Sequence, residues 1–155
     1  MTPAINQLIT TKIKHSVLAY THDPISASFG LEAVEKLNLP SKLVFKTLMV
    51  TLDGRDLVVA IVPVDTTLNM KKLAKIAKSK KAEMASQQSA EKSSGYILGG
   101  ISPLGQKRKL KTFIDESALE FEKIYVSGGK RGLEIELSAL DLISITKAVV
   151  CSLKK

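Results

Sequence analysis

Two apolar segments in the first half of the chain have the pattern of buried strands. Residues 42–52 (KLVFKTLMVTL) and 56–64 (DLVVAIVPV) are hydrophobic at nearly every position, which is typical of sheet covered on both faces. Asp53 and Gly54 separate the two segments, and this dipeptide strongly favours a two-residue hairpin turn. The pattern therefore predicts a buried antiparallel hairpin, with one charged residue, Lys46, inside its first strand.

Shorter alternating stretches and capping residues predict the remaining elements. Five more strands are expected, at residues 15–21, 111–115, 123–127, 132–137 and 147–152. Five helices are expected, four of them after the caps Thr2, Ser28, Asn69 and Ser138 and a short one within residues 86–94. The first helix would bury Ile5, Leu8 and Ile9, and the third would extend over residues 70–81.

The order of these elements indicates the fold class. Hairpins mixed with single helices do not give the regular strand–helix alternation of a doubly wound fold. We therefore predict a mixed α+β fold, in which a mixed, mostly antiparallel sheet curls into a partly closed barrel with helices packed outside. The length of 155 residues suits a single domain over residues 1–155.

The helix predicted at 70–81 has a basic face. Lys71, Lys72, Lys75 and Lys78 fall on one arc, opposite Met70, Leu73, Ile76 and Ala77. Such a face is most often only solvated, and contact with phosphates is the alternative. The net charge of +8 favours a polyanionic partner, although solubility alone would also account for it.

Several kinds of chemistry lack the residues they need. With one cysteine and two histidines, the sequence predicts no disulfide framework, no metal site and no Ser-His-Asp triad. Neither a Walker loop nor a dinucleotide fingerprint is present, so no cofactor is expected. No stretch has the pattern of a signal peptide or of a membrane span, and we expect a cytoplasmic protein in a reducing compartment.

Two features suggest a ligand site. An unpaired ammonium is costly to bury, so Lys46 should either reach water from an edge strand or meet an anion. The pairs Gly99-Gly100 and Gly128-Gly129 are each followed within a few residues by Lys or Arg. Glycine lets a ligand approach backbone amides closely, as a phosphate or an oxyanion requires, although turns without function would explain the glycines equally well.

Three longer stretches carry a family resemblance. VFKTLMV (44–50), GYILGGISPLGQKRKL (95–110) and IYVSGGKRGLEIEL (124–137) occur in an order and spacing that closely resemble the YbaK/prolyl-tRNA-synthetase-associated family. TPAINQLI and YTHDP extend the resemblance over essentially the whole chain. It implies a free-standing aminoacyl-tRNA deacylase with the fold of that family. The implied substrate is tRNA(Pro) mischarged with cysteine, and the implied partners are tRNA and, transiently, prolyl-tRNA synthetase.

The resemblance also assigns roles to single residues. Lys46 matches an essential lysine thought to hold a phosphate near the tRNA 3′ end, and Gly99 and Gly100 match a loop whose backbone faces the scissile ester. The implied substrate pocket includes Tyr20, Phe29, Thr47, Ile101, Ser127, Gly128 and Glu134, where Glu134 replaces the more usual Asp. The basic residues expected to face tRNA are Lys71, Lys75, Lys78, Lys107, Arg108, Lys130 and Arg131.

The implied mechanism needs no protein nucleophile. The thiol of the attached cysteine would attack its own ester carbonyl and release a cyclic thiolactone, while the protein orients the ester and stabilises the oxyanion. Two alternatives stay open. The chain could remove another small amino acid, alanine or serine, or it could be a non-catalytic module that binds tRNA or a synthetase. Neither the oligomeric state nor the preferred ester follows from the sequence.

Overall fold

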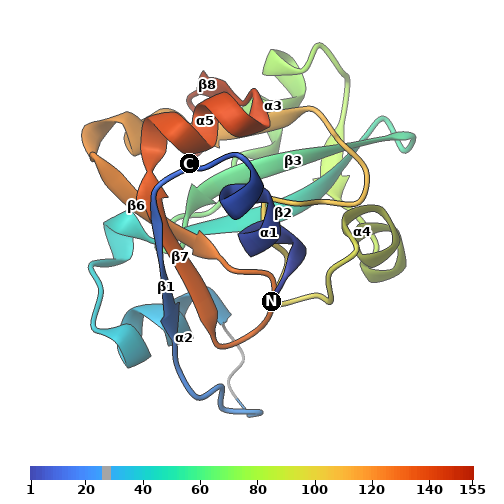
Figure 1. Ribbon diagram of the computed structural model, residues 1–155. Helices are drawn as coiled ribbons and strands as arrows, with labels where there is room; N and C mark the ends of the chain where they lie inside the picture. The colour runs from blue at the N-terminus through green and yellow to red at the C-terminus, as the bar shows by residue number, and fades with distance from the viewer. Residues whose placement is uncertain (26–28) are drawn as a thin grey trace.

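The computed structural model describes residues 1–25 and 29–155 (Figure 1). The predicted cap Ser28 and the side chain of Phe29 lie outside the described part. The α-helices are α1 (Pro3–Thr10), α2 (Phe29–Leu37), α3 (Met70–Ile76), α4 (Gln87–Ser94) and α5 (Ala139–Thr146), with short 3₁₀ helices at Ser41–Leu43 and Glu116–Glu120. The strands are β1 (His15–Ala19), β2 (Phe45–Leu52), β3 (Asp56–Pro63), β4 (Ala82–Met84), β5 (Thr112–Asp115), β6 (Lys123–Ser127), β7 (Leu133–Ser138) and β8 (Val149–Cys151).

The strands form two sheets rather than the one that was predicted. A three-stranded sheet has the order β1-β7-β6, and a five-stranded sheet has the order β4-β2-β3-β5-β8. Four strand pairs are antiparallel, whereas β3-β5 and β5-β8 are parallel, which confirms the mixed α+β class. The two sheets meet at a bridge between Val44 and Tyr125, and no closed barrel is found among the described strands.

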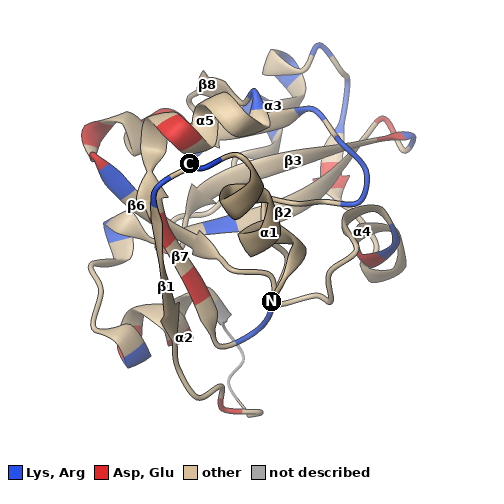
Figure 2. Ribbon diagram, in the orientation of Figure 1, with Lys and Arg blue, Asp and Glu red and all other residues tan. Residues whose placement is uncertain are grey.

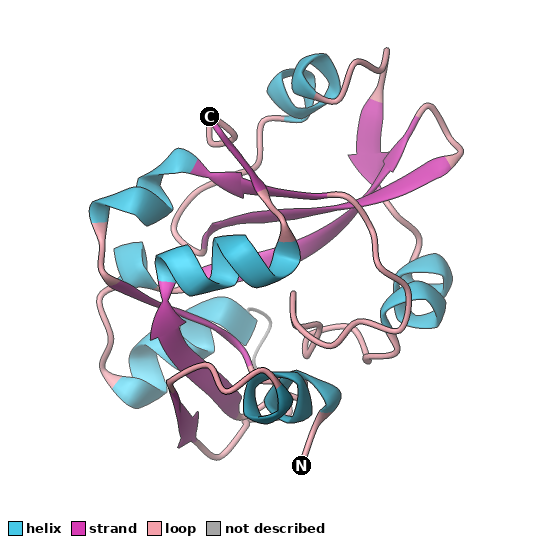
Figure 3. Cartoon of the chain, turned by 45° about the horizontal axis from the view of Figure 1, so that its top comes forward, coloured by secondary structure: helices cyan, strands magenta, loops and turns pink. Residues whose placement is uncertain are grey.

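The apolar hairpin is buried on both faces because two cores flank it. Val59 and Ile61 of β3 point into a core shared by both sheets, α1 and α5, whereas Val58 and Val62 point into a second core under α3. Alternate residues of a strand face opposite sides, so a strand between two cores must be apolar throughout. Figure 3 shows α5 beside both sheets and α3 at the far side of the larger one.

Turn and cap predictions are largely confirmed. Asp53 and Gly54 have φ of 52° and 69°, as the predicted tight hairpin turn requires. The side chains of Thr2, Asn69, Ser86 and Ser138 each accept a hydrogen bond from a backbone N–H of the first helical turn. The helices that begin after Thr2, Asn69 and Ser138 therefore begin where the sequence predicts, whereas the cap at Ser86 was not predicted.

Two predictions about helices are wrong. The helix expected at 70–81 ends at Ile76, because Lys78 adopts a left-handed conformation with φ of 57°. The N–H groups of Lys80 and Lys81 then both donate to Asp53 Oδ1 at 2.9 Å, and the chain continues into β4, which the sequence did not predict. In α1, Leu8 is fully buried as expected, but Ile9 is 53% exposed.

The first turn of α1 is seated against two glycine turns. Thr2 Oγ1 donates a hydrogen bond to the carbonyl of Gly128, and a Cβ atom at Gly129 would lie 3.0 Å from the Thr2 Cβ. At Gly105, where φ is 63°, a Cβ atom would lie only 2.5 Å from the Pro3 carbonyl carbon. The glycines thus allow the start of the chain to pack directly against these turns. No described helix has the length and hydrophobicity to cross a membrane.

Candidate active site

A cavity of about 340 Å³ opens between the two sheets. Its lining comes from both sheets, α2, the end of β1, the loop after α4 and the β6–β7 turn. Eight predicted residues share this lining: Tyr20, Lys46, Thr47, Gly99, Ile101, Ser127, Lys130 and Glu134. Gly30, Val44, Phe45, Leu48 and Leu98 complete it. Segments as distant as residues 20 and 134 therefore converge on one cavity.

The cavity lies where the first half of β2 has a neighbouring strand on one side only. β3 pairs with the whole of β2, whereas β4 pairs only with Val50–Leu52. Five consecutive residues, Val44–Leu48, line the cavity. In a strand, alternate side chains point to opposite faces, so a consecutive run of lining residues indicates that the edge of the strand itself faces the cavity. β2 therefore offers backbone as well as side chains to a ligand.

Lys46 provides a cation at the cavity wall. It is half-buried, and its Nζ donates a hydrogen bond to the carbonyl of Thr66 at 2.8 Å. Burial lowers the pKa of Lys46, while the nearby Asp65 carboxylate opposes this effect. Among the described residues, no carboxylate lies within ion-pair distance of Lys46. Its charge is therefore not neutralised by the protein, and it is available to an anionic group in the cavity.

Two buried polar atoms in the lining lack a hydrogen-bond partner among the described residues, Thr47 Oγ1 and Glu134 Oε2. Glu134 is only 7% exposed, and burial raises its pKa to about 8. Burial also raises the pKa of Tyr20, with a further contribution from Glu134. Buried polar atoms are normally satisfied, so unpaired atoms that face a cavity indicate where a polar ligand would bind.

The glycine loop presents one free amide. Gly99 lines the cavity with φ of 93°, and its N–H has no partner within the described part of the chain. The N–H of Gly100 instead donates to the Ile97 carbonyl at 2.9 Å, which closes the turn. A Cβ atom on Gly100 would lie 2.8 Å from the Lys130 Cα, so the loop packs directly on the β6–β7 turn. Of the two predicted glycines, only Gly99 has a free donor at the cavity.

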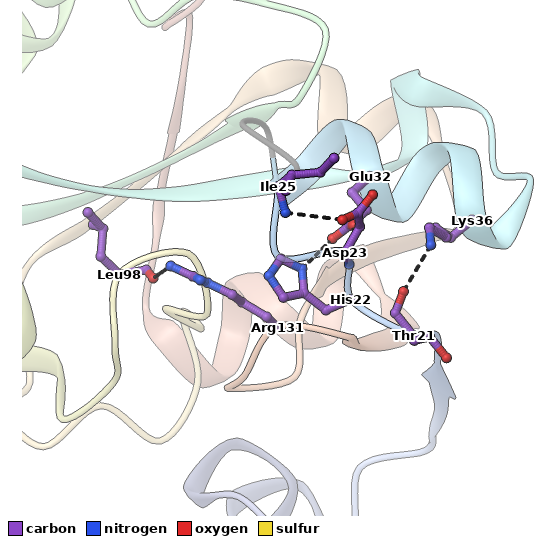
Figure 4. Close-up of polar contacts among 8 residues, drawn as sticks. All are labelled: Thr21, His22, Asp23, Ile25, Glu32, Lys36, Leu98 and Arg131. Atoms are coloured by element: carbon purple, nitrogen blue, oxygen red, sulfur yellow. Dashed lines mark hydrogen bonds and ion pairs between the residues drawn. The ribbon is translucent and has the colours of Figure 1, made fainter.

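Polar contacts hold the rim of the cavity together (Figure 4). Arg131 Nη2 donates to the Leu98 carbonyl at 2.9 Å and thereby joins the β6–β7 turn to the glycine loop. Near the start of α2, His22 Nδ1 lies 2.6 Å from Glu32 Oε1, and the Asp23 N–H donates to Glu32 Oε2 at 2.8 Å. Burial would raise the pKa of Glu32, but these hydrogen bonds lower it overall. The predicted turn at His22 is therefore anchored to α2.

Other predicted residues lie outside the lining. Gly128 closes the β6–β7 turn, and its N–H donates to the Leu133 carbonyl at 2.8 Å. Lys71 and Lys75 are exposed on α3, and Lys78 follows its end. Lys107 and Arg108 belong to a basic loop between α4 and β5 that is blue in Figure 2. In the part of the chain that the structure describes, the cations of the cavity lining are therefore Lys46 and Lys130.

The sequence analysis missed five lining residues, and each had only a weak signal. Val44, Phe45 and Leu48 resemble ordinary core residues of a strand, and Gly30 lies inside a helix. Leu98 lies next to the glycine pair but is apolar and 42% exposed. In the described part of the chain, no group of three or more His, Cys, Asp or Glu residues is arranged to hold a metal ion.

We expect Glu134→Gln to stabilise the protein at about pH 9 by at least about 1.4 kcal/mol, the equivalent of one pKa unit. An unfolded glutamate has a pKa near about 4.3, whereas the folded value is about 8. Between these values the folded protein keeps a proton that the unfolded chain has released, so stability falls as the pH rises. Glutamine cannot ionise, and the variant should lose this dependence.

Urea unfolding at several pH values between about 5 and 9 measures this effect. Glu122→Gln is the matched control, because Glu122 is exposed and should keep the wild-type dependence. If Glu134→Gln and the wild type changed in parallel over this range, the carboxyl would not titrate as its burial requires.

Comparisons with known proteins identify a family and two solved structures with the same fold. Residues 26–145 match the family model of the aminoacyl-tRNA editing domain. The chain is 38% identical over 133 residues to EbsC of Enterococcus faecalis, described as a candidate Cys-tRNA(Pro)/Cys-tRNA(Cys) deacylase. This alignment covers 86% of the present chain and 79% of EbsC.

Two solved structures share the fold at low sequence identity. A protein described as a candidate trans-editing enzyme for prolyl-tRNA synthetase superposes with a TM-score of 0.83 and 20% identity, over 99% of this chain and 95% of that one. The hypothetical protein APE2540 gives a TM-score of 0.88 and 21% identity, over 99% of both chains. At such identities the likeness supports the fold alone.

Proposed function

Because the chain belongs to the aminoacyl-tRNA editing domain family, we propose that it is a trans-acting deacylase that removes cysteine from mischarged tRNA(Pro). Cysteine and proline are similar in size, and a single binding pocket discriminates poorly between such side chains. A second site that destroys the wrong ester is the general remedy. The relative EbsC, described as acting on cysteinyl-tRNA, supports the choice of substrate.

One observation carries the proposal: the cavity combines a cation, a free amide and an unpaired buried carboxyl. In our proposal the Lys46 ammonium holds the phosphate next to the terminal adenosine. The Gly99 N–H points to the ester carbonyl and stabilises the oxyanion that develops there. Glu134 receives the ammonium of the amino acid, whose charge would favour the ionised carboxylate. Each part of an aminoacyl-adenosine end thus has a complementary group.

The proposed reaction uses the substrate's own thiol. The cysteine sulfur attacks the ester carbonyl carbon, the carbon–oxygen bond to the ribose breaks, and the thiol proton ends on the ribose oxygen. The products are cysteine thiolactone and tRNA with a free hydroxyl, so no water is consumed in this step. Among the described residues, the cavity lining contains no His or Cys side chain. A mechanism in which the protein only orients and stabilises suits this lining.

The test is to incubate the protein with tRNA(Pro) charged with cysteine, serine, alanine or proline and to follow the loss of each ester. Serine is the matched comparison, because it differs from cysteine only in carrying a hydroxyl in place of the thiol. We expect the cysteinyl ester to disappear at least about 100-fold faster than the seryl ester, because a positioned thiol makes the reaction intramolecular.

Other outcomes of this test would change the proposal. Similar rates for cysteine, serine and alanine would replace the thiol mechanism with ordinary hydrolysis of small esters. RNA binding without loss of any ester would instead identify a binding module.

We also propose that discrimination among tRNAs comes from a partner. This partner would be prolyl-tRNA synthetase, associated transiently in the cytoplasm, where tRNA is charged.

A further inference from the structure

A second cavity, of about 370 Å³, lies between α1, the loop before β5 and the end of α5. Its lining comprises Gln7, Pro103, Gly105, Gln106, Arg108, Lys109, Leu110, Lys111, Thr112, Ile145, Thr146 and Lys147. The predicted residue Arg108 is part of it, and nothing in the proposed chemistry of the first cavity uses the other members.

The charge of this second cavity is entirely positive. Four cationic residues line it, Arg108, Lys109, Lys111 and Lys147, and no Asp or Glu of the described residues does so. Within the described chain, none of these four forms an ion pair with a carboxylate. A cleft lined by one sign of charge concentrates its field and attracts ions of the opposite sign. The natural ligand of this lining is an anion.

The polar groups between these cations are held in place. Gln7 Oε1 accepts a hydrogen bond from the Gly105 N–H at 2.7 Å, so its amide NH₂ group remains a free donor among the described residues. Gln106 Nε2 donates to the Ser102 carbonyl at 2.9 Å. Because α1 packs directly against Gly105, the position of Gln7 relative to the basic loop is fixed. The cavity thus presents cations and a neutral donor on a rigid frame.

The two cavities share one segment of chain. Ile101 lines the first and Pro103 lines the second. Two residues of extended chain span at most about 7 Å, so the two linings are adjacent. Successive phosphates of a nucleic-acid strand lie only a few ångströms apart, about 3.4 Å along the axis in one strand of duplex DNA. An RNA whose 3′ end enters the first cavity would therefore have its preceding phosphates within reach of the second.

From this arrangement we infer that the second cavity binds backbone phosphates of the tRNA acceptor end, through Arg108, Lys109, Lys111 and Lys147. The inference rests on the proposed function, because it takes the first cavity as the site of the 3′ end. Four cations spread over an open cavity suit a chain of phosphates better than a single small anion. The exposed lysines of α3, in contrast, line neither cavity.

The test compares two variants with the same loss of charge. R108Q/K109Q/K147Q removes three cations from the second cavity, whereas K80Q/K123Q/K155Q removes three exposed lysines from elsewhere. Binding of uncharged tRNA is measured over a range of salt concentrations. Each lost phosphate contact reduces the salt slope by about 1, so the first variant should lose about 3 from its slope and bind at least about tenfold more weakly. The control should keep the wild-type slope.

Deacylation supplies a second readout. Full-length cysteinyl-tRNA(Pro) is compared with a short cysteinylated RNA that contains only the terminal nucleotides and cannot span both cavities. The preference for the full-length substrate, as a ratio of kcat/KM values, should fall about tenfold in the first variant and persist in the control. Equal losses in both variants would overturn the inference, because net charge alone would then explain binding.

Failure of this inference and failure of the proposed function are distinguishable. If the wild-type protein cleaved no ester, the deacylase proposal would fail, but the binding assay would still report on the second cavity. If the wild-type protein cleaved cysteinyl-tRNA while R108Q/K109Q/K147Q kept both its salt slope and its substrate preference, only the assignment of the second cavity would be wrong.

Discussion

Replacing Lys46 with alanine should reduce deacylation of cysteinyl-tRNA at least about 100-fold while leaving the protein folded. Loss of one group that stabilises charge in a reacting complex typically costs a factor of about 100 to 1,000. The ammonium is not part of an ion pair within the described chain, and its main contact is the Thr66 carbonyl. Removing it therefore relieves the cost of burying a charge and should have little effect on stability.

Single-turnover deacylation and thermal unfolding together measure this outcome. Lys42→Ala is the control, because Lys42 is an exposed lysine on the neighbouring 3₁₀ helix and does not line the cavity. A Lys46→Ala protein with wild-type activity would refute the proposed role of the ammonium. A variant that was inactive and also unfolded would show that Lys46 is needed for the fold.

Replacing Gly100 with alanine should lower both stability and activity. A Cβ atom at this position would lie 2.8 Å from the Lys130 Cα and 3.1 Å from the Arg131 N, and these backbone atoms cannot move aside as a flexible side chain would. We expect a loss of about 1–3 kcal/mol from overpacking. The loop and the β6–β7 turn must also separate, which displaces Gly99, and a displacement of about 1 Å can reduce a rate about 100-fold.

Gly54→Ala is the control that separates the loss of stability from the loss of activity. Gly54 also matters for backbone conformation, since its φ is 69°, but a Cβ atom there would meet no other atom within 4 Å, and Gly54 does not line the cavity. This variant should lose stability in urea unfolding and keep its rate per folded molecule. If Gly100→Ala deacylated at the wild-type rate, the close packing of the glycine loop would have no role in catalysis.

Local signals were sufficient to predict the hairpin, most helix starts and the unusual position of Lys46. Asp53-Gly54 determines the hairpin turn through its backbone preference, and this effect involves only neighbouring residues. The burial of β2 and β3 on both faces likewise follows from their apolar composition. These features could be predicted because the physical cause lies within a few residues of the effect.

The number of sheets and the place of the cavity depend on contacts between distant segments. β4 pairs with β2, and the chain just before it is held by Asp53, 27 and 28 residues away, which accepts the N–H groups of Lys80 and Lys81. Residues 82–84 show no alternating pattern that would predict this strand. The cavity lies along the part of β2 that β4 leaves unpaired, because β4 pairs only with Val50–Leu52, and a sequence pattern carries no information about where pairing stops.

Some properties of the site residues could likewise be predicted from the sequence, whereas others depend on contacts between distant segments. The resemblance gave Lys46 and Glu134 as members of one site, and the structure places both in one lining. The resemblance did not indicate that Glu134 Oε2 would lack a hydrogen-bond partner. That depends on which side chains from distant segments pack beside the carboxyl group. Similarly, the charge of Lys147 becomes relevant only once α5 ends beside the basic loop.

The contact between the first turn of α1 and the glycine turns has a consequence for variation between relatives. Thr2 fits because position 129 carries no side chain, Pro3 and Ala4 fit because position 105 carries none, and the Thr2 hydroxyl in turn satisfies the Gly128 carbonyl. A substitution in the first turn of α1 changes the surface against which the glycine turns pack, and a substitution in a glycine turn changes the surface against which α1 packs. The opening residues and the two distant turns should therefore change together in evolution, or not at all.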